Sequence, residues 1–208
     1  MPLWDHAFPG IHIDGHHTFV SSAAGDLNLL RSRPLGLDLL TLISKRCQGI
    51  GTKVVDGKVV IRRVMSSYNR IVASTMSDPD DDSVIMRNGR KIPGTAIQLV
   101  GYGSSSCVTY DPVQTVLYSQ AISLPTPTYI VLAHELIHSL HFLSGDWRNH
   151  DDFDTLLMHE EARTIGTGIY ANARLSENSI RREWGQTQMR TFHRYPGDCD
   201  GLVSVIPA

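Results

Sequence analysis

The chain has few charges, and very few lysines, for its 208 residues. Charged side chains make up 19% of the sequence, the formal net charge is -2, and only four of the 19 basic residues are lysines. This composition argues against a polybasic surface, which is the usual electrostatic means of holding nucleic acids or anionic membranes. We therefore expect neither a nucleic acid nor a membrane as a partner.

Cysteines and long hydrophobic runs are also scarce. Cys47, Cys107 and Cys199 are far apart and odd in number, which suits neither a zinc ribbon nor a disulfide framework. The apolar run over residues 129–133 is far shorter than the roughly 20 residues that span a bilayer. The N-terminus lacks the basic and apolar regions of a Sec signal. We expect a soluble protein that would be secreted, if at all, without a Sec signal.

The first half of the chain carries mainly β-type patterns. A hairpin is expected over residues 52–62, because Asp56 and Gly57 suit a two-residue type I′ turn between two β-branched stretches. A helix over residues 37–47 is the exception. Further strands are expected within residues 11–20 and over residues 68–74, 96–102 and 107–110.

Helical patterns dominate from residue 126 onward. One helix is expected over residues 126–145, with Thr126 as N-cap, Pro127 at the first helical position and Gly145 as the stop. Two more are expected, over residues 153–170 and 176–185. The order of patterns predicts an α+β fold with a β-rich N-terminal half and a helical C-terminal half. We expect one domain, residues 1–208, in which residues 1–20 could form a loosely attached N-terminal arm.

The helix over residues 126–145 is apolar on nearly all faces, yet it carries strongly polar side chains. A helix of this kind is buried, and buried polar groups are costly unless they are paired or bind a metal. His134, Glu135 and His138 form the pattern HExxH, which places two imidazoles one turn apart on one face. Both can reach one tetrahedral Zn²⁺, and Glu135 can act as general base on a water. We therefore predict a zinc site with His134 and His138 as ligands.

The third ligand separates the classes of zinc peptidase. The metzincin pattern HExxHxxGxxH is absent, because His141 and Ser144 stand where it needs glycine and histidine. A glutamate on the next helix, the gluzincin arrangement, fits better, and Glu161 is preferred to Glu160. The other glutamate and His141 are expected to support the ligands from outside. The alternatives that stay open for the third ligand are Glu160 and the aspartates Asp146, Asp151, Asp152 and Asp154.

Three ordered motifs within residues 128–194 carry a family resemblance. The segment VLAHELIHSLHFLSG (residues 131–145), followed by EEARTIG (residues 160–166), resembles the zinc helix and the EE-x-R-T-x-G segment of clostridial neurotoxin light chains. SENSIRREWG (residues 176–185) and Arg190 resemble the SENxIRxExG…R segment of NleD-like effector metallopeptidases. These are compact bacterial effectors delivered into host cells by type III secretion.

The resemblance implies a zincin-like fold and a set of site residues. Zinc would be held by His134, His138 and Glu161, with Glu135 as catalytic base. Both families continue with an R-x-x-Y element whose arginine and tyrosine stabilise the oxyanion. Arg190 matches the arginine, whereas His193 stands at the tyrosine position, so Arg190 and His193 are the expected catalytic pair, with Tyr195 as the alternative. Asn178 is expected to organise the local turn or helix start.

The resemblance also implies a function. It points to a zinc metalloendopeptidase, a monomeric virulence effector that reaches the target-cell cytoplasm and cleaves a host signalling protein such as a stress-activated MAP kinase. One alternative is an interbacterial protease toxin domain of a polymorphic toxin, which would be toxic in a bacterial cytosol. Another is a non-catalytic zinc-containing binding module, in which Glu135→Gln would leave every biological effect intact.

Overall fold

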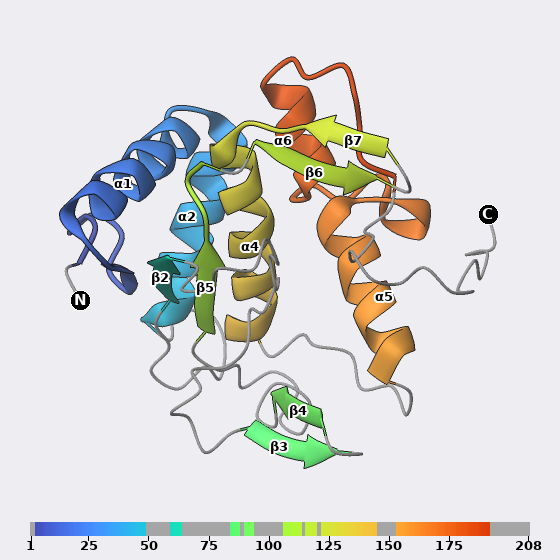
Figure 1. The fold of residues 1–208 in the computed structure, drawn as a ribbon, viewed down its shortest axis with the longest axis horizontal. Coiled ribbons are helices and arrows are strands. Elements are labelled where there is room, and N and C mark those ends of the chain that lie inside the picture. Colours follow the sequence, from blue (N-terminus) through green and yellow to red (C-terminus); the bar gives the residue numbers. More distant parts are fainter. Residues whose placement is uncertain are drawn as a thin grey trace.

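The fold is built around one helix, α4 (Thr128–Leu143). α4 packs against four helices and one strand: α1 (His17–Arg31), α2 (Pro34–Cys47), α5 (Phe153–Ile165), α6 (Glu177–Glu183) and β5 (Ser106–Tyr110). In Figure 1 it lies between α2 and α5. The computed structural model describes residues 3–48, 59–63, 84–87, 90–93, 106–113, 115–119, 122–144 and 153–191. Within these ranges the molecule combines helices with small sheets.

A three-stranded parallel sheet supports the N-terminal helices. Its order is β1 (Ile11–Asp14), β2 (Val59–Arg63) and β5 (Ser106–Tyr110). Ile13 is paired with Ile61, and Ile61 with Val108, so a row of buried aliphatic side chains crosses the sheet. Parallel sheets are covered by helices, and here α1 packs on β1 while α4 packs on β5.

Two short antiparallel pairs complete the described β-structure. β3 (Val84–Arg87) pairs with β4 (Arg90–Pro93), and β6 (Val116–Ser119) pairs with β7 (Ile122–Pro125). β7 leads into α4 through Thr126 and Pro127. The second pair therefore fixes where the central helix begins.

α4 is buried around almost its whole circumference. Ile130, Leu132, Leu136 and Ile137 have no exposed surface and lie in one core with residues of α1, α2 and the sheet. The N-terminal segment joins the same core through Phe8, Ile11, Ile13 and Phe19. The site-bearing helix is thus held from several directions, which fixes the side chains that it carries.

The segment between α5 and α6 turns sharply. α5 ends at Ile165 because Gly166 takes a positive φ of 81°, a conformation that favours glycine. A 3₁₀ turn, η1 (Gly168–Tyr170), follows. α6 begins with a capping box in which Ser176 and Ser179 each bond the other's backbone N–H. The turn brings α6 back onto α4.

Several expectations about the elements are confirmed. β1 lies within residues 11–20, β5 covers residues 107–110, and α2 ends at Cys47. α6 follows Ser176 and stops before Gly185, and a helix begins at Phe153. The strands expected over residues 68–74 and 96–102 lie outside the described residues, as does the first arm of the hairpin expected over residues 52–62.

Other expectations are wrong. The described part of the N-terminal half is not simply β-rich, because α1 (His17–Arg31) adds a helix that was not expected beside the expected one that ends at Cys47. β2 is not a hairpin arm: β1 and β5 already occupy both of its edges. Thr126 is not a helix cap, because its hydroxyl donates to the carbonyl of Leu124 and accepts a bond from Arg181. The helix after Phe153 is shorter than expected, since Gly166 ends it.

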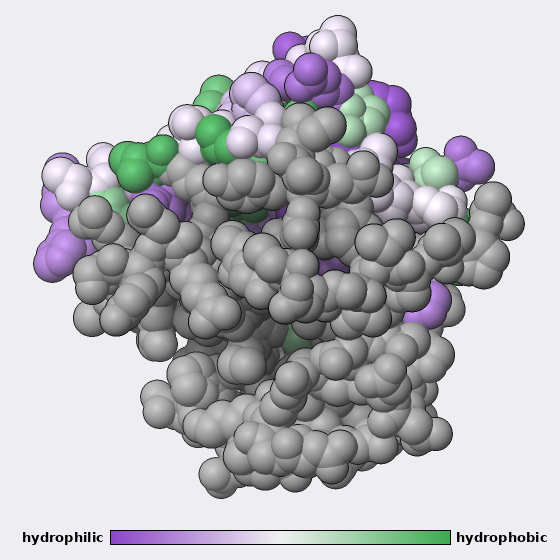
Figure 2. All heavy atoms as spheres, turned by 45° about the vertical axis from the view of Figure 1, so that its right-hand side comes forward, coloured by the Kyte–Doolittle hydropathy of each residue, from purple (hydrophilic) through white to green (hydrophobic). Residues whose placement is uncertain are grey.

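None of the helices that the structure describes is long and apolar enough to cross a membrane. The face shown in Figure 2 presents described residues of mixed hydropathy along its upper edge. The large hydrophobic side chains that are exposed among the described residues belong to separate elements and loops: Leu29, Leu37, Val113 and Ile169.

Candidate metal centre

Three buried side chains from α4 and α5 bring their ligand atoms together. Nε2 of His134 lies 3.2 Å from Nε2 of His138. Glu161 of α5 places one carboxylate oxygen 3.4 Å from Nε2 of His134 and the other 3.3 Å from Nε2 of His138. All three side chains are at most 7% exposed. The ligand predicted from α5 thus lies with the two histidines of α4.

The spacing of these atoms suits a single metal ion. A tetrahedral Zn²⁺ with bonds of about 2.0–2.1 Å places its ligand atoms about 3.4 Å apart. The two Nε2 atoms are 3.2 Å apart, close to that value, and a different oxygen of Glu161 lies 3.4 Å from His134 and 3.3 Å from His138, so the carboxylate faces both imidazoles. Two imidazoles and one carboxylate are also a usual protein ligand set for catalytic zinc. The residues therefore fit the metal that their sequence pattern predicts.

Glu160 supports the second histidine from its other side. One oxygen of Glu160 lies 3.0 Å from Nδ1 of His138 and 2.5 Å from Nδ1 of His141. The hydroxyl of Thr164 donates to the same oxygen. A carboxylate at Nδ1 holds the imidazole so that Nε2 faces the metal. Glu160 and His141 therefore lie behind the group of ligand atoms, and Glu161 lies within it.

The first histidine has a carboxylate partner of its own. Oε2 of Glu177, on α6, lies 2.9 Å from Nδ1 of His134. Arg181 donates to the other oxygen of Glu177 at 2.7 Å, and Arg190 donates to Oε2 at 2.9 Å. Glu177 and Arg181 have no exposed surface, and Arg190 is 2% exposed. Two buried guanidinium groups thus fix the carboxylate that orients His134.

The two outer carboxylates are held in their charged form. Burial alone would raise the pKa of Glu160, but the charge of His141 and hydrogen bonds from His138 and His141 lower it to about 2. Burial also opposes ionisation of Glu177, yet the charge of Arg190 and the bond from His134 bring its pKa well below the usual range. Charged carboxylates strengthen their hold on the imidazoles.

Glu135 differs from the other glutamates of the site. It is buried, and its Oε2 has no hydrogen-bond partner in the part of the chain that the structure describes. Burial raises the pKa of Glu135, whereas the charges of His134, His138 and Arg190 lower it and that of Glu161 raises it. A carboxylate with a raised pKa and an open acceptor oxygen is suited to exchanging protons.

Arg190 is fixed through its backbone as well as its side chain. The amide of Asn178 donates to the carbonyl of Arg190 at 2.7 Å, and the Arg190 N–H donates back at 2.9 Å. Asn178 also donates to the carbonyl of Gly166 at 3.4 Å. Asn178 therefore joins the end of α5, the start of α6 and the segment that carries Arg190. Its hydrogen bonds thus extend beyond the local turn or helix start that it was expected to organise.

The structure does not place every residue predicted for the site. His193, Tyr195, Asp146, Asp151 and Asp152 lie outside the described residues, and Asp154 lies in the first turn of α5.

The sequence patterns gave no role to Glu177, whose carboxylate lies beside the first histidine, or to Arg181, which donates to that carboxylate. One signal could have indicated Glu177. The chain has only five glutamates, and all of them lie within residues 135–183, from the HExxH pattern to the SENSIRREWG segment that contains Glu177.

Comparison with known families decides which family this is. The model of peptidase family M91, described as effector protein, matches residues 9–192, which is most of the chain. The chain belongs to family M91. Membership implies that this M91 effector is a peptidase, and it confirms the NleD-like resemblance. Comparison of the M91 chain with curated proteins gives no match.

Proposed function

We propose that this M91 effector is a zinc-dependent endopeptidase of the gluzincin type with a zincin-like domain over residues 1–208. His134, His138 and Glu161 would hold the zinc. The observation that carries the proposal is the convergence of their ligand atoms at separations of 3.2 to 3.4 Å. Family membership supports the peptidase activity independently.

Glu135 would act as the catalytic base. When bound, zinc would lower the pKa of a water and polarise the scissile carbonyl. Glu135 would accept a proton from that water through its unpartnered Oε2 and later donate it to the leaving amine. Burial raises the pKa of Glu135 toward neutral pH, which helps it both to accept the proton from water and to donate it to the amine.

Arg190 would stabilise the negative charge that develops on the substrate. Its guanidinium is buried and fixed by Glu177, and its charge lowers the pKa of Glu135, which supports a role close to the reacting groups. His193 follows three residues later and is the proposed second donor, with Tyr195 as the alternative. The fixed position of Arg190 supports its proposed role in stabilising the oxyanion, because a donor that is already in place needs no reorganisation during the reaction.

The proposed substrate is a host protein. Membership of an effector family supports delivery into host cells and a protein substrate. The NleD-like resemblance makes a stress-activated MAP kinase our proposed target, cleaved by a monomeric enzyme after type III secretion. An interbacterial toxin would instead be toxic when expressed in a bacterial cytosol, and the Glu135→Gln variant would remove that toxicity.

The metal site is tested by the zinc content of the untagged chain. Plasma mass spectrometry should find about one zinc per wild-type chain and a clear loss in Glu161→Ala. Full zinc in both proteins would reject Glu161 as a ligand. No zinc in either protein, after zinc is supplied and the excess is dialysed away, would reject the metallopeptidase proposal.

The catalytic step is tested by Glu135→Gln. This variant should keep its zinc but lose about 10²- to 10⁴-fold in the rate of substrate cleavage, which is the usual worth of a general base. The assay is cleavage of purified stress-activated kinases, followed by mass spectrometry of the fragments. Equal effects of wild type and Glu135→Gln in host cells would favour the binding module instead.

A further inference from the structure

One arginine of α6 holds the carboxylate on which two parts of the proposed site depend. The guanidinium of Arg181 donates from Nε to Oε1 of Glu177 at 2.7 Å, and from Nη2 to the hydroxyl of Thr126 at 2.7 Å. Arg181 and Glu177 have no exposed surface, and Thr126 is 2% exposed. Because Thr126 stands between β7 and α4, the guanidinium is held at two points by two different parts of the fold.

The other oxygen of Glu177 serves two partners at once. Oε2 lies 2.9 Å from Nδ1 of His134 and accepts a bond from Nη1 of Arg190, also at 2.9 Å. The orientation of this one carboxylate therefore affects both a proposed zinc ligand and the proposed oxyanion donor. A glutamate carboxylate turns easily about its last bond unless both oxygens are held. Arg181 is the residue that holds the second oxygen.

Arg181 also affects how Arg190 can bind Glu177. An arginine and a carboxylate favour a paired arrangement, in which two N–H groups donate to the two oxygens. Here the bond from Arg190 goes to Oε2, whereas Oε1 is taken by Arg181. If Arg181 were absent, Arg190 could turn its guanidinium to face both oxygens of Glu177. Such a turn would change where Arg190 presents its donors to a substrate.

We propose that Arg181 is a positioning residue for the peptidase reaction. It keeps Glu177 in the orientation that serves His134, and it prevents Arg190 from pairing with both oxygens of Glu177. This inference rests on the proposed function, in which Arg190 stabilises the oxyanion. Stability alone does not account for Arg181, because buried ion pairs often contribute no more stability than apolar side chains of similar size.

Steady-state cleavage of purified stress-activated kinases by the zinc-loaded chain tests this role. Arg181→Met keeps an unbranched side chain but has no charge and no donor for Oε1. It should lower kcat by about 10- to 100-fold, because a displacement of about 1 Å at a catalytic group can cost about 100-fold. KM should stay nearly unchanged, and about one zinc per chain should remain, because Glu177 still holds His134. Arg181→Lys, which keeps a charged donor for Oε1, should recover part of the lost kcat.

A milder pair of variants tests the same role if Arg181→Met does not fold. Thr126→Val removes the hydroxyl that holds Nη2 of Arg181 and changes no charge. It should lower kcat by a smaller factor, and Thr126→Ser, which keeps the hydroxyl, should restore it. Unchanged kcat in Arg181→Met, or in Thr126→Val where Arg181→Met does not fold, would reject the role. A loss of zinc in parallel with the loss of kcat would also reject it, because it would indicate general damage to the metal centre.

A spectroscopic readout needs no peptide substrate. In ¹⁵N NMR spectra of the zinc-loaded chain, the guanidinium signals of Arg190 should shift in Arg181→Met, because Arg190 gains access to the vacated oxygen of Glu177. Unshifted Arg190 signals would reject the role even in an active enzyme. A wild-type chain that cleaves no kinase, together with shifted signals, would overturn the proposed function and keep Arg181 as the residue that positions Arg190.

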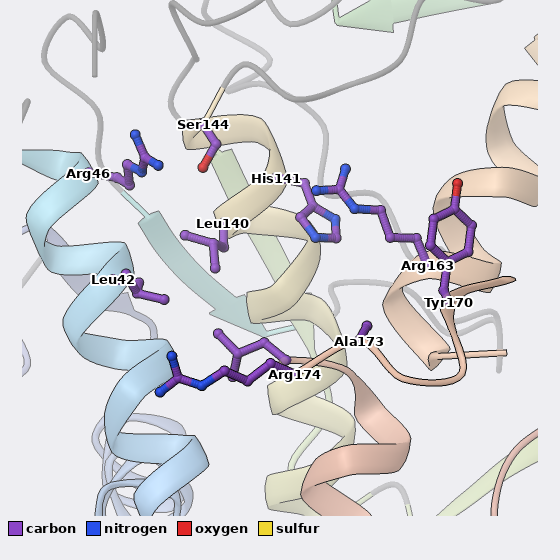
Figure 3. Close-up of a pocket in the computed structure, with 10 residues that line it drawn as sticks. Leu42, Arg46, Leu140, His141, Ser144, Arg163, Tyr170, Ala173 and Arg174 are labelled. Atoms are coloured by element: carbon purple, nitrogen blue, oxygen red, sulfur yellow. The ribbon is translucent and has the colours of Figure 1, made fainter. Parts of the chain in front are cut away.

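Arg174→Met is the matched control, because it removes one positive charge just before α6. Arg174 lines a hollow between α2, α4 and α5, where its side chain points toward α2 (Figure 3). It pairs there with Asp38 at 2.9 Å and is 78% exposed. The described lining of this hollow includes neither Glu177 nor the two arginines that hold it. Arg174→Met should match the wild type in kcat and in the Arg190 signals, and an equal loss of kcat in Arg174→Met would reject a specific role of Arg181.

Discussion

At the scale of single residues, the site consists of three inner side chains and the carboxylates that hold them. His134 and His138 were predictable because HExxH fixes two imidazoles one turn apart on one helix. Glu161 was predictable as a glutamate on the next helix. The contact between Glu177 and His134 was not, because it joins residues 43 positions apart and depends on how α6 returns to α4.

Glu177 should control metal affinity through His134. Replacing it by glutamine weakens the hold on Nδ1 and leaves Arg181 and Arg190 without their buried countercharge. We expect Glu177→Gln to weaken zinc binding by about 10- to 100-fold, as is usual for outer partners of metal ligands. Competition with a chelating dye measures this directly.

The matched control lies on the same helix. Glu183 accepts a bond from the backbone N–H of Leu35 at 2.9 Å and contacts none of the proposed zinc ligands. Glu183→Gln should therefore bind zinc like the wild type. Equal zinc affinities for Glu177→Gln and Glu183→Gln would show that the Glu177 carboxylate does not support the metal.

A second residue-scale prediction concerns Asp26. It accepts hydrogen bonds from Tyr110 of β5 and Thr128 of α4. Burial raises the pKa of Asp26, and the two hydrogen bonds only partly oppose this. Between its usual pKa and the raised one, the folded state binds more protons than the unfolded state, so the stability due to Asp26 falls as pH rises.

Asparagine does not titrate, and this makes the effect measurable. The free energy of unfolding of Asp26→Asn, relative to wild type, should increase as pH rises from about 4 to about 7. Urea unfolding of both proteins at each pH gives the difference. A difference that stays constant or falls over this range would contradict the raised pKa of Asp26.

At the scale of elements, prediction succeeded where local signals decide the structure. Ser176 begins α6, as expected, because its capping box is local. The end of α5 was not predicted, because the positive φ of Gly166 cannot be told in advance from that of any other glycine. Local signals failed at β2, where pairing with two distant strands replaced the expected hairpin. α1 was not predicted, although its buried residues follow helical spacing: Phe19, Ala23, Leu27 and Leu30.

Gly166 should be the most sensitive glycine of the α5–α6 turn. A Cβ on Gly166 would lie 2.4 Å from the hydroxyl oxygen of Ser176, and its φ of 81° is unfavourable for alanine. We expect Gly166→Ala to destabilise the protein by about 1–2 kcal/mol or more from the backbone alone. Gly25→Ala, in the middle of α1 with no atom near the added Cβ, should instead stabilise by about 0.5–1 kcal/mol. Thermal melts that rank the two variants in the opposite order would contradict this account.

At the scale of the whole molecule, the order of patterns along the sequence indicated a mixed fold. It could not give the arrangement, because parallel strands from residues 11, 59 and 106 meet only through long connections. The motifs that carried the resemblance began at residue 128, whereas the family model matches from residue 9. The N-terminal part carries no motif of reactive residues because its described side chains mainly build the core.

Metal removal should affect the stability of the whole domain. The proposed zinc joins α4 to α5, and an ion bound only by the folded state stabilises it by about 4 kcal/mol at a thousandfold excess over its dissociation constant. For a chain of this length we expect a chelator to lower the melting midpoint by about 2–4 °C per kcal/mol lost. Glu161→Ala should respond much less. Equal melting midpoints for the wild type with and without chelator would contradict a bound metal that stabilises the folded state.

The central position of α4 has a consequence for synthesis on the ribosome. Chains emerge N-terminus first, so α1 and α2 leave the ribosome long before residues 128–143 exist. Until then Leu27, Leu39 and Ile43, which end in the core shared with α4, lack that partner. The nascent N-terminal part therefore presents an apolar surface to the cytosol of the producing cell. A holding chaperone during translation would protect it, and the domain can close only when α4 arrives.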